Sequence, residues 1–142
     1  MKTAISYFFI FISLNTFAST TTQDFTGKYE LISGDQDCAQ NLRLSSYFDD
    51  ELTVDNLETS NLLLGFSSIN EGVTSKTYGQ LGHKICYKNT IEGNKLIKYQ
   101  SEEISIFRPC LLTKLNAVHS LEINADKLLT HIYQKNCQYQ KL

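Results

Sequence analysis

Apolar and polar residues alternate along most of the chain from residue 25 onward. A period of two residues is typical of β-strands that turn one face toward a core. Polar clusters such as Ser33-Gly34-Asp35 and Glu92-Gly93-Asn94 separate the stretches and favour chain reversal. The alternating stretches are residues 27–33, 41–46, 51–55, 61–69, 83–89, 95–100, 103–107, 119–124 and 127–134.

Strand after strand with short connections predicts an all-β fold in which the strands form an antiparallel meander. We expect a small up-and-down β-barrel of about eight strands, because a closed barrel has no exposed sheet edges. A two-sheet sandwich is the alternative. The clearest hairpins are IEGNKL and INADKL. The alternation predicts these core positions: Phe25, Tyr29, Leu31, Leu42, Leu44, Leu52, Val54, Leu62, Leu64, Phe66, Ile85, Tyr87, Ile104, Ile106, Leu121 and Ile123.

The stretch FTGKYEL, residues 25–31, resembles the opening strand of lipocalin-like, calycin-type barrels. Members of that group begin with an aromatic-x-Gly-x-aromatic pattern, usually with Trp where this chain has Tyr29. The resemblance implies a small secreted barrel. A second resemblance is to small secreted barrels that inhibit bacterial metalloproteases. It lies in the order of Gly27, Tyr29, Leu31, Cys38, Leu42 and Leu44.

The N-terminus has the three parts of a secretory signal peptide. Lys2 precedes an apolar run from Ala4 to Leu14, which is too short to span a membrane, and the small residues Ala18 and Ser19 follow. We expect cleavage after Ala18 and a secreted or periplasmic product. The predicted organisation is a signal peptide at 1–18, a flexible N-terminal arm at 19–24 and a single barrel domain at 25–142.

The charge of the mature chain excludes some partners. After residue 18 the chain has twelve Lys and Arg and fifteen Asp and Glu, which gives a net charge of −3. This mildly acidic balance gives no reason to expect nucleic acid or an anionic membrane as a partner. No later segment is apolar for long enough to predict a membrane span.

All four cysteines lie in the predicted mature chain, which predicts two disulfides. The gaps between them are too wide for the close ligand pairs of zinc sites. Of the three possible pairings we prefer Cys38–Cys137 with Cys86–Cys110, because barrel closure brings the first strands beside the last one, NCQYQKL. The first bridge would contribute about 4–5 kcal/mol on the chain-entropy model.

No pattern of catalytic or metal-binding residues appears. Asp35 and Asp37 in SGDQDC are spaced as in a calcium loop, but the later ligands are missing, so we interpret the stretch as a turn held by Cys38. The acidic stretch at 47–58 is interpreted as solvated turns. The three histidines, His83, His119 and His131, lie in no hydrolase or metalloprotease motif. We predict no enzyme activity, no cofactor and no metal.

Aromatic side chains are the remaining chemical resource of the chain. Inward residues could line a ligand cavity or could fill the barrel, and the sequence leaves both open. We therefore predict a non-enzymatic binding protein for a small apolar ligand or a protein partner. An inhibitor of a secreted enzyme, acting through the 19–24 arm or a rim loop, and a structural envelope protein are the alternatives. The candidate ligand residues are Phe25, Tyr29, Phe66 and Tyr87.

Overall fold

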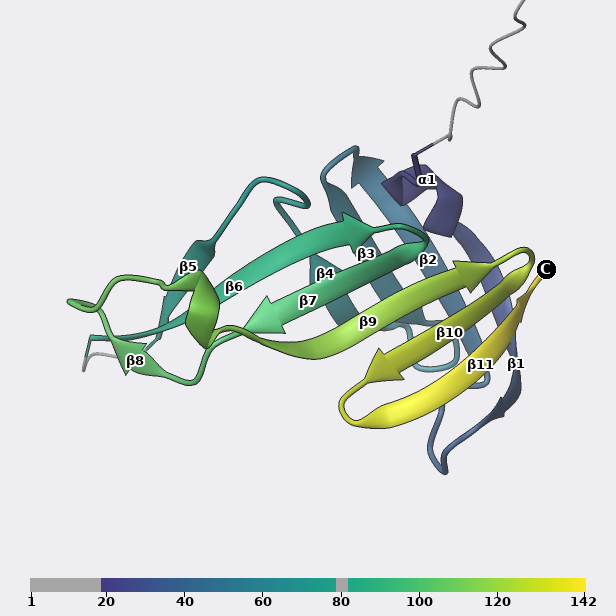
Figure 1. Cartoon of the computed structure of the whole chain (residues 1–142). Coiled ribbons are helices and arrows are strands. Elements are labelled where there is room, and N and C mark those ends of the chain that lie inside the picture. The colour runs from purple at the N-terminus through teal and green to yellow at the C-terminus, as the bar shows by residue number, and fades with distance from the viewer. Residues whose placement is uncertain (1–18, 79–81) are drawn as a thin grey trace, which may run out of the picture.

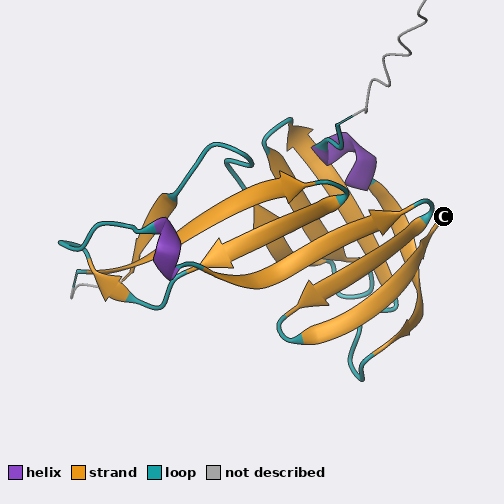
Figure 2. Cartoon of the chain, viewed as in Figure 1, coloured by secondary structure: helices purple, strands orange, loops and turns teal. Residues whose placement is uncertain are grey.

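A computed structural model describes residues 19–78 and 82–142, and the predicted signal peptide lies outside them. Strands dominate this part of the chain, and two short helical turns complete it (Figures 1 and 2). The elements are α1 (Thr22–Phe25), β1 (Gly27–Gly34), β2 (Asn41–Phe48), β3 (Glu51–Asn56), β4 (Asn61–Phe66), β5 (Thr74–Tyr78), β6 (His83–Glu92), β7 (Lys95–Gln100), β8 (Ile104–Ser105), η1 (Leu112–Lys114), β9 (Asn116–Asn124), β10 (Lys127–Ile132) and β11 (Lys135–Lys141).

All eleven strands belong to one antiparallel sheet in the order β4-β3-β2-β1-β11-β10-β9-β7-β6-β5, with β8 paired to β6. The expected up-and-down, barrel-like, disulfide-linked fold is confirmed, and it has more strands than the eight expected. The first strand pairs with the last, as barrel closure requires. At the other end of this strand order, the chain that follows β4 lies against β6. There Ile69 forms a β-bridge with Asn89, and the buried Asn89 side-chain amide donates to the Ser67 carbonyl, 2.6 Å away.

Both hairpins that the sequence predicts are present, as β6–β7 and β9–β10. The sequence analysis did not identify β5, because TSKTY has no alternation of apolar residues and pairs only at the sheet edge. The strand predicted at 127–134 is shorter in the structure, because Tyr133 and Gln134 form the turn between β10 and β11.

The core lies inside the curved sheet and contains most of the predicted positions. Leu62 is an exception, with 61% of its surface exposed, because a bulge between Val54 and Asp55 reverses which side chains of β4 face inward. Ile106 is also exposed, since it follows the short β8 outside the barrel. The buried core residues are Phe25, Tyr29, Cys38, Leu42, Leu44, Leu52, Val54, Leu64, Phe66, Ile69, Leu96, Leu121, Leu128, Cys137 and Tyr139.

The helix α1 covers one end of the barrel and occupies part of the segment that the sequence analysis assigns to an arm. Thr22 is buried and its hydroxyl donates to the Asp49 carbonyl, 3.1 Å away. Phe25 is fully buried, and its carbonyl accepts a 2.8 Å bond from the phenol of Tyr29. Burial raises the pKa of that phenol to about 12. These contacts tie α1 to the first two strands and the β2–β3 turn.

The SGDQDC stretch is a turn joined to the last strand. Cys38 is bonded to Cys137, with the two Cα atoms 6.1 Å apart. The Asp35 carboxylate accepts from the Asn136 amide at 2.7 Å, so this acid has a structural partner. A Cβ atom on Gly34 would lie 2.7 Å from the Cys38 sulfur and 2.9 Å from the Cys137 Cα. The disulfide and the missing side chain together bring the β1–β2 turn against β11.

The second disulfide, Cys86–Cys110, lies in an extension of the barrel. The outer half of β6 pairs with β5 on one side and with β8 on the other, beyond the part that pairs with β7. This extension, with η1, lies at the left of Figure 1, away from α1 and β11. Both disulfides have the pairing that the sequence analysis preferred. Within residues 19–78 and 82–142, no helix is long and apolar enough to cross a membrane.

Candidate functional site

A cavity of about 510 Å³ opens at the barrel end opposite α1. We call it the end cavity. It lies beside the β10–β11 turn and between β4, β7 and β9. Its walls combine apolar side chains with a lysine, two imidazoles and two side-chain amides. The lining residues are Leu64, Lys98, Gln100, Ala117, Val118, His119, His131, Tyr133 and Gln134.

The side chain of Lys98 lines this cavity because Lys98 is on the inward face of strand β7. Leu96 is fully buried in the core, and side chains two residues apart share one face of a strand. Lys98 therefore faces the interior from the position that follows Leu96 on that face. Lys95 and Ile97 lie on the opposite face of the strand. The sequence KLIKYQ has adjacent apolar residues, Leu96 and Ile97, so alternation alone gives no basis for choosing which face is inward.

The ammonium of Lys98 has polar and aromatic neighbours inside the barrel. It donates to the Gly65 carbonyl across the interior, 3.1 Å away, and lies 5.6 Å from the centre of the Tyr87 ring. In the described part of the chain no carboxylate lies within 4.0 Å of it. Burial lowers the pKa of Lys98, the Tyr87 phenol raises it, and the positive charge of Lys76 lowers it further. A half-buried cation without an acidic partner is suited to an anionic ligand.

His119 stands beside Lys98, as its register partner on β9. Burial lowers the pKa of His119, and the charges of Lys98 and His131 lower it further, so the imidazole is neutral near pH 7. Its Nδ1 accepts a 3.3 Å bond from the Tyr133 amide. The ring packs edge-to-face against the Tyr133 ring, with centroids 4.9 Å apart. The ammonium of Lys98 therefore has the neutral imidazole of His119 beside it in the site.

Tyr133 lies across this end of the barrel. Its phenol donates to the Leu63 carbonyl, 3.1 Å away, and so joins the β10–β11 turn to β4. Both turn residues have positive φ, 49° for Tyr133 and 65° for Gln134, a conformation that usually takes Asn and Gly. The same ring also borders a smaller apolar cavity of about 140 Å³ that includes Leu42, Ile132 and Tyr139. Tyr133 thus lies between two hollows.

The structure separates the four aromatic residues that the sequence suggested as ligand contacts. Phe25, Tyr29 and Phe66 are packed in the core. Only Tyr87 lies near the end cavity, where its ring contacts the Lys98 ammonium. The sequence analysis named His119 only as one of three histidines outside any catalytic motif, and it did not identify Lys98 or Tyr133 as site residues. A polar residue in phase with a buried Leu on a strand is the signal that could have indicated Lys98.

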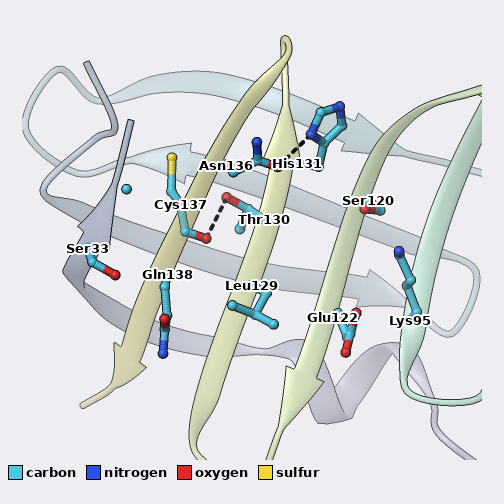
Figure 3. A pocket seen from close by; sticks show the side chains of 11 residues that line it. Ser33, Lys95, Ser120, Glu122, Leu129, Thr130, His131, Asn136, Cys137 and Gln138 are labelled. Atoms are coloured by element: carbon cyan, nitrogen blue, oxygen red, sulfur yellow. Dashed lines mark hydrogen bonds between the residues drawn. The ribbon is translucent and has the colours of Figure 1, made fainter. Parts of the chain in front are cut away.

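A further hollow, of about 370 Å³, lies on the outer face of β9, β10 and β11 (Figure 3). We call it the outer cleft. Gln138, Leu129, Glu122 and Lys95 form a row across it, one from each neighbouring strand. Glu122 and Lys95 occupy paired positions and carry opposite charges, so this cleft has no unbalanced charge for a ligand. The end cavity is the better candidate for a binding site.

The outer cleft also holds Ser120, His131 and Asn136 in adjacent strands (Figure 3). A hydrolase needs its serine within hydrogen-bond reach of the imidazole. In the described structure His131 Nδ1 lies 2.9 Å from the Asn136 side-chain oxygen, and no bond joins His131 to Ser120. Within the same residues, no group of three His, Cys, Asp or Glu is arranged to hold a metal ion.

No family model matches the chain, and no curated protein matches it. Solved structures resemble it over most of its length. A mutant of the fatty acid transporter REP1-NXSQ has 15% identity and a TM-score of 0.49, covering 84% of this chain and 99% of its own. The wild-type fluorescent protein UnaG has 14% identity and a TM-score of 0.46, covering 85% and 99%. At this level of similarity, function is inferred from the residues of the chain itself.

Proposed function

We propose that this chain is an exported, non-enzymatic binding protein that takes a small apolar molecule with an anionic head group into the end cavity. The observation that carries the proposal is the Lys98 ammonium inside the barrel, which bonds to the Gly65 carbonyl and has no carboxylate within 4.0 Å among the described residues. The volume of about 510 Å³ lies within the range of roughly 300–1,000 Å³ that is common for small-molecule pockets. Two disulfides suit an oxidising compartment outside the cytoplasm.

Charge compensation gives the physical reason for an anionic ligand. Removing an ammonium from water disfavours its charged form, and an opposite charge nearby restores that form. A carboxylate beside Lys98 would supply this charge and could also bond to His119. Leu64, Val118 and the Tyr133 ring would contact the apolar part of the ligand. The site thus supports recognition of both ends of an amphipathic molecule.

Calorimetric titration with decanoate and with decanol tests this proposal. We expect Lys98→Met to weaken decanoate binding by about tenfold to a hundredfold, because a hydrogen bond to a charged group contributes about 1.5–3 kcal/mol. Binding of the uncharged decanol should change little. Lys95→Met is the matched control, since Lys95 lies on the outer face of the same strand.

Thermal melting of the ligand-free variants separates lost binding from lost folding. The pKa of Lys98 is lowered in the folded state, so its protonated form opposes folding at neutral pH. Lys98→Met should therefore melt at the same temperature as the wild type or higher. Equal decanoate affinities for the Lys98 and Lys95 variants, or no decanoate binding by the wild type, would reject the proposal.

A further inference from the structure

Charge is unevenly divided along the chain. Residues 74–115, which include β5 to η1, carry seven Lys and Arg and three Asp and Glu, a net charge of +4. The rest of the predicted mature chain, 19–73 and 116–142, carries five and twelve, a net charge of −7. The overall charge of −3 conceals this division. Within residues 74–115 the extension has four basic residues, Lys76, Lys84, Arg108 and Lys114, and two acidic residues, Glu102 and Glu103. An anionic surface therefore attracts the molecule with its extension first.

The extension ends in a loop of apolar residues, 106–112, which we call the apolar loop. The Arg108 amide donates to the Ser105 carbonyl, 3.0 Å away, which closes a turn around Ile106 and Phe107. Phe107 has 90% of its surface exposed. Leu111 and Leu112 follow, and both are also exposed. Burying these side chains against other protein atoms would stabilise the chain, yet the fold leaves them in contact with solvent.

The apolar loop is held in place at both of its ends. Its first residue, Ile106, donates its amide to the Gly82 carbonyl at 2.7 Å. A Cβ atom on Gly82 would lie 3.2 Å from the Ile106 side chain, so the two residues pack closely. Near the other end, Cys110 is bonded to Cys86, which is fully buried on β6. The exposed position of Phe107 is therefore built into the fold.

Basic side chains flank the apolar loop. Lys84 on β6 is the register partner of Ile104, two residues before the loop begins. Arg108 lies within the loop, and Lys114 is the last residue of η1. Two acids, Glu102 and Glu103, precede the loop, and Glu103 is 3.4 Å from His83. The loop thus combines a projecting aromatic ring with positive charges on either side.

We propose that the apolar loop docks the protein on an anionic lipid surface, with Phe107 and Leu112 entering the boundary between head groups and acyl chains. Apolar side chains beside Lys and Arg are the combination that binds such surfaces, where each basic residue contributes about 1 kcal/mol. This proposal does not depend on the ligand of the end cavity. The net charge alone gave no reason to expect an anionic membrane as a partner, and the proposal rests instead on the local charge around this loop.

The shape of the loop favours lipid over a protein partner. A stable protein interface buries at least about 1,200 Å² in total and needs a surface that is complementary to its partner. The apolar loop is a narrow projection, with Phe107 as its most exposed side chain. A lipid interface requires no complementary shape, and a single exposed aromatic ring can enter it.

Co-sedimentation with vesicles tests the proposal. The protein is used with both disulfides formed, and a measurement of its intact mass establishes at which residue it begins. One set of vesicles contains phosphatidylcholine alone and the other adds phosphatidylglycerol. We expect the wild type to bind the anionic set at low salt and to dissociate as salt rises. Phe107→Ser should weaken this binding at least about tenfold. Phe48→Ser is the matched control, because Phe48 is 68% exposed but lies on β2 in the acidic region.

Charge variants complete the experiment. Arg108→Gln should weaken binding to anionic vesicles about fivefold, whereas Lys127→Gln, on the outer face of β10, should leave it unchanged. No binding of the wild type to anionic vesicles would overturn the proposal, as would equal losses in the Phe107 and Phe48 variants. Sedimentation equilibrium tests whether the loop binds a second copy of the chain instead. That would be the conclusion if the wild type forms a dimer, Phe107→Ser abolishes the dimer, and this variant still binds vesicles. Retained vesicle binding by Phe107→Ser without any dimer would mean that charge alone attracts the protein.

Discussion

Lys98 and His119 are register partners on β7 and β9, and both side chains line the same end cavity. The two residues are far apart in the sequence and come from stretches in which polar and apolar residues are mixed. The positive charge of Lys98 contributes to the lowered pKa of His119, so a second positive charge in the cavity is disfavoured. An anion between them would relieve this repulsion.

The pH dependence of stability should reveal His119. Because its pKa is lower in the folded chain than in the unfolded chain, the unfolded chain takes up the proton first. The free energy of unfolding contributed by His119 should therefore fall as the pH drops below about 6.5. Urea unfolding between neutral and mildly acidic pH measures it. His119→Gln should flatten the slope. An unchanged slope in His119→Gln would contradict this assignment.

Tyr133 should control access to the end cavity. Tyr133→Phe keeps the ring beside His119 but removes the bond to the Leu63 carbonyl, which should cost about 1 kcal/mol and speed the release of decanoate. Tyr133→Asn suits the positive φ of the turn and removes the ring, so it should accelerate release further while the protein stays folded. Stopped-flow displacement measures the rates. Release rates equal to that of the wild type in both variants would exclude a gating role.

Gly34 should tolerate no side chain. Gly34→Ala would push a Cβ atom against the Cys38 sulfur and the Cys137 backbone, which should cost about 1–3 kcal/mol. Gly65→Ala is the control, because nothing lies within 4 Å of its added Cβ atom. Urea titration of the oxidised proteins compares them. Equal stability of the two variants would mean that the β1–β2 turn can move away from β11.

Substitution of Phe66 should lower the stability of the fold without removing a ligand contact. It is buried in the core rather than in the end cavity, so Phe66→Ala should cost about 3–5 kcal/mol. Phe48→Ala, at an exposed position, should stay within about 0.5 kcal/mol of the wild type. Denaturant unfolding gives both values. If Phe66→Ala unfolds normally but loses decanoate affinity, the ligand occupies the barrel interior rather than its end.

Export should remove residues 1–18. Sequencing the N-terminus of the product released by the native host should give Ser19 as its first residue, because Ala18 follows the short apolar run at a position that favours small residues. A product that begins upstream of Phe17 would refute this cleavage site, and retention in the membrane would indicate an anchor instead.

The sequence by itself determined the fold class, most of the strands and the turns of both predicted hairpins. Successive side chains of a β-strand point to opposite faces of the sheet, so Leu42 and Leu44 lie on one face, as do Leu52 and Val54. Apolar residues at such alternate positions therefore indicate a strand with one buried face. Gly93-Asn94 and Ala125-Asp126 form the turns of the two predicted hairpins. Closure of the barrel likewise gave a geometric reason to pair Cys38 with Cys137, the bridge that the structure contains.

Only the tertiary structure decided which residues form the candidate site. In KLIKYQ, two adjacent apolar residues make either face acceptable, and the pairing of β7 with β9 turns Lys98 inward. The bulge in β4 that exposes Leu62 depends on its partner strand, since a single inserted residue reverses every side chain beyond it. Tyr133 reaches Leu63 only because the curved sheet brings residues 70 positions apart together. Local pattern sets which residues alternate, whereas the register between distant strands sets where each side chain lies.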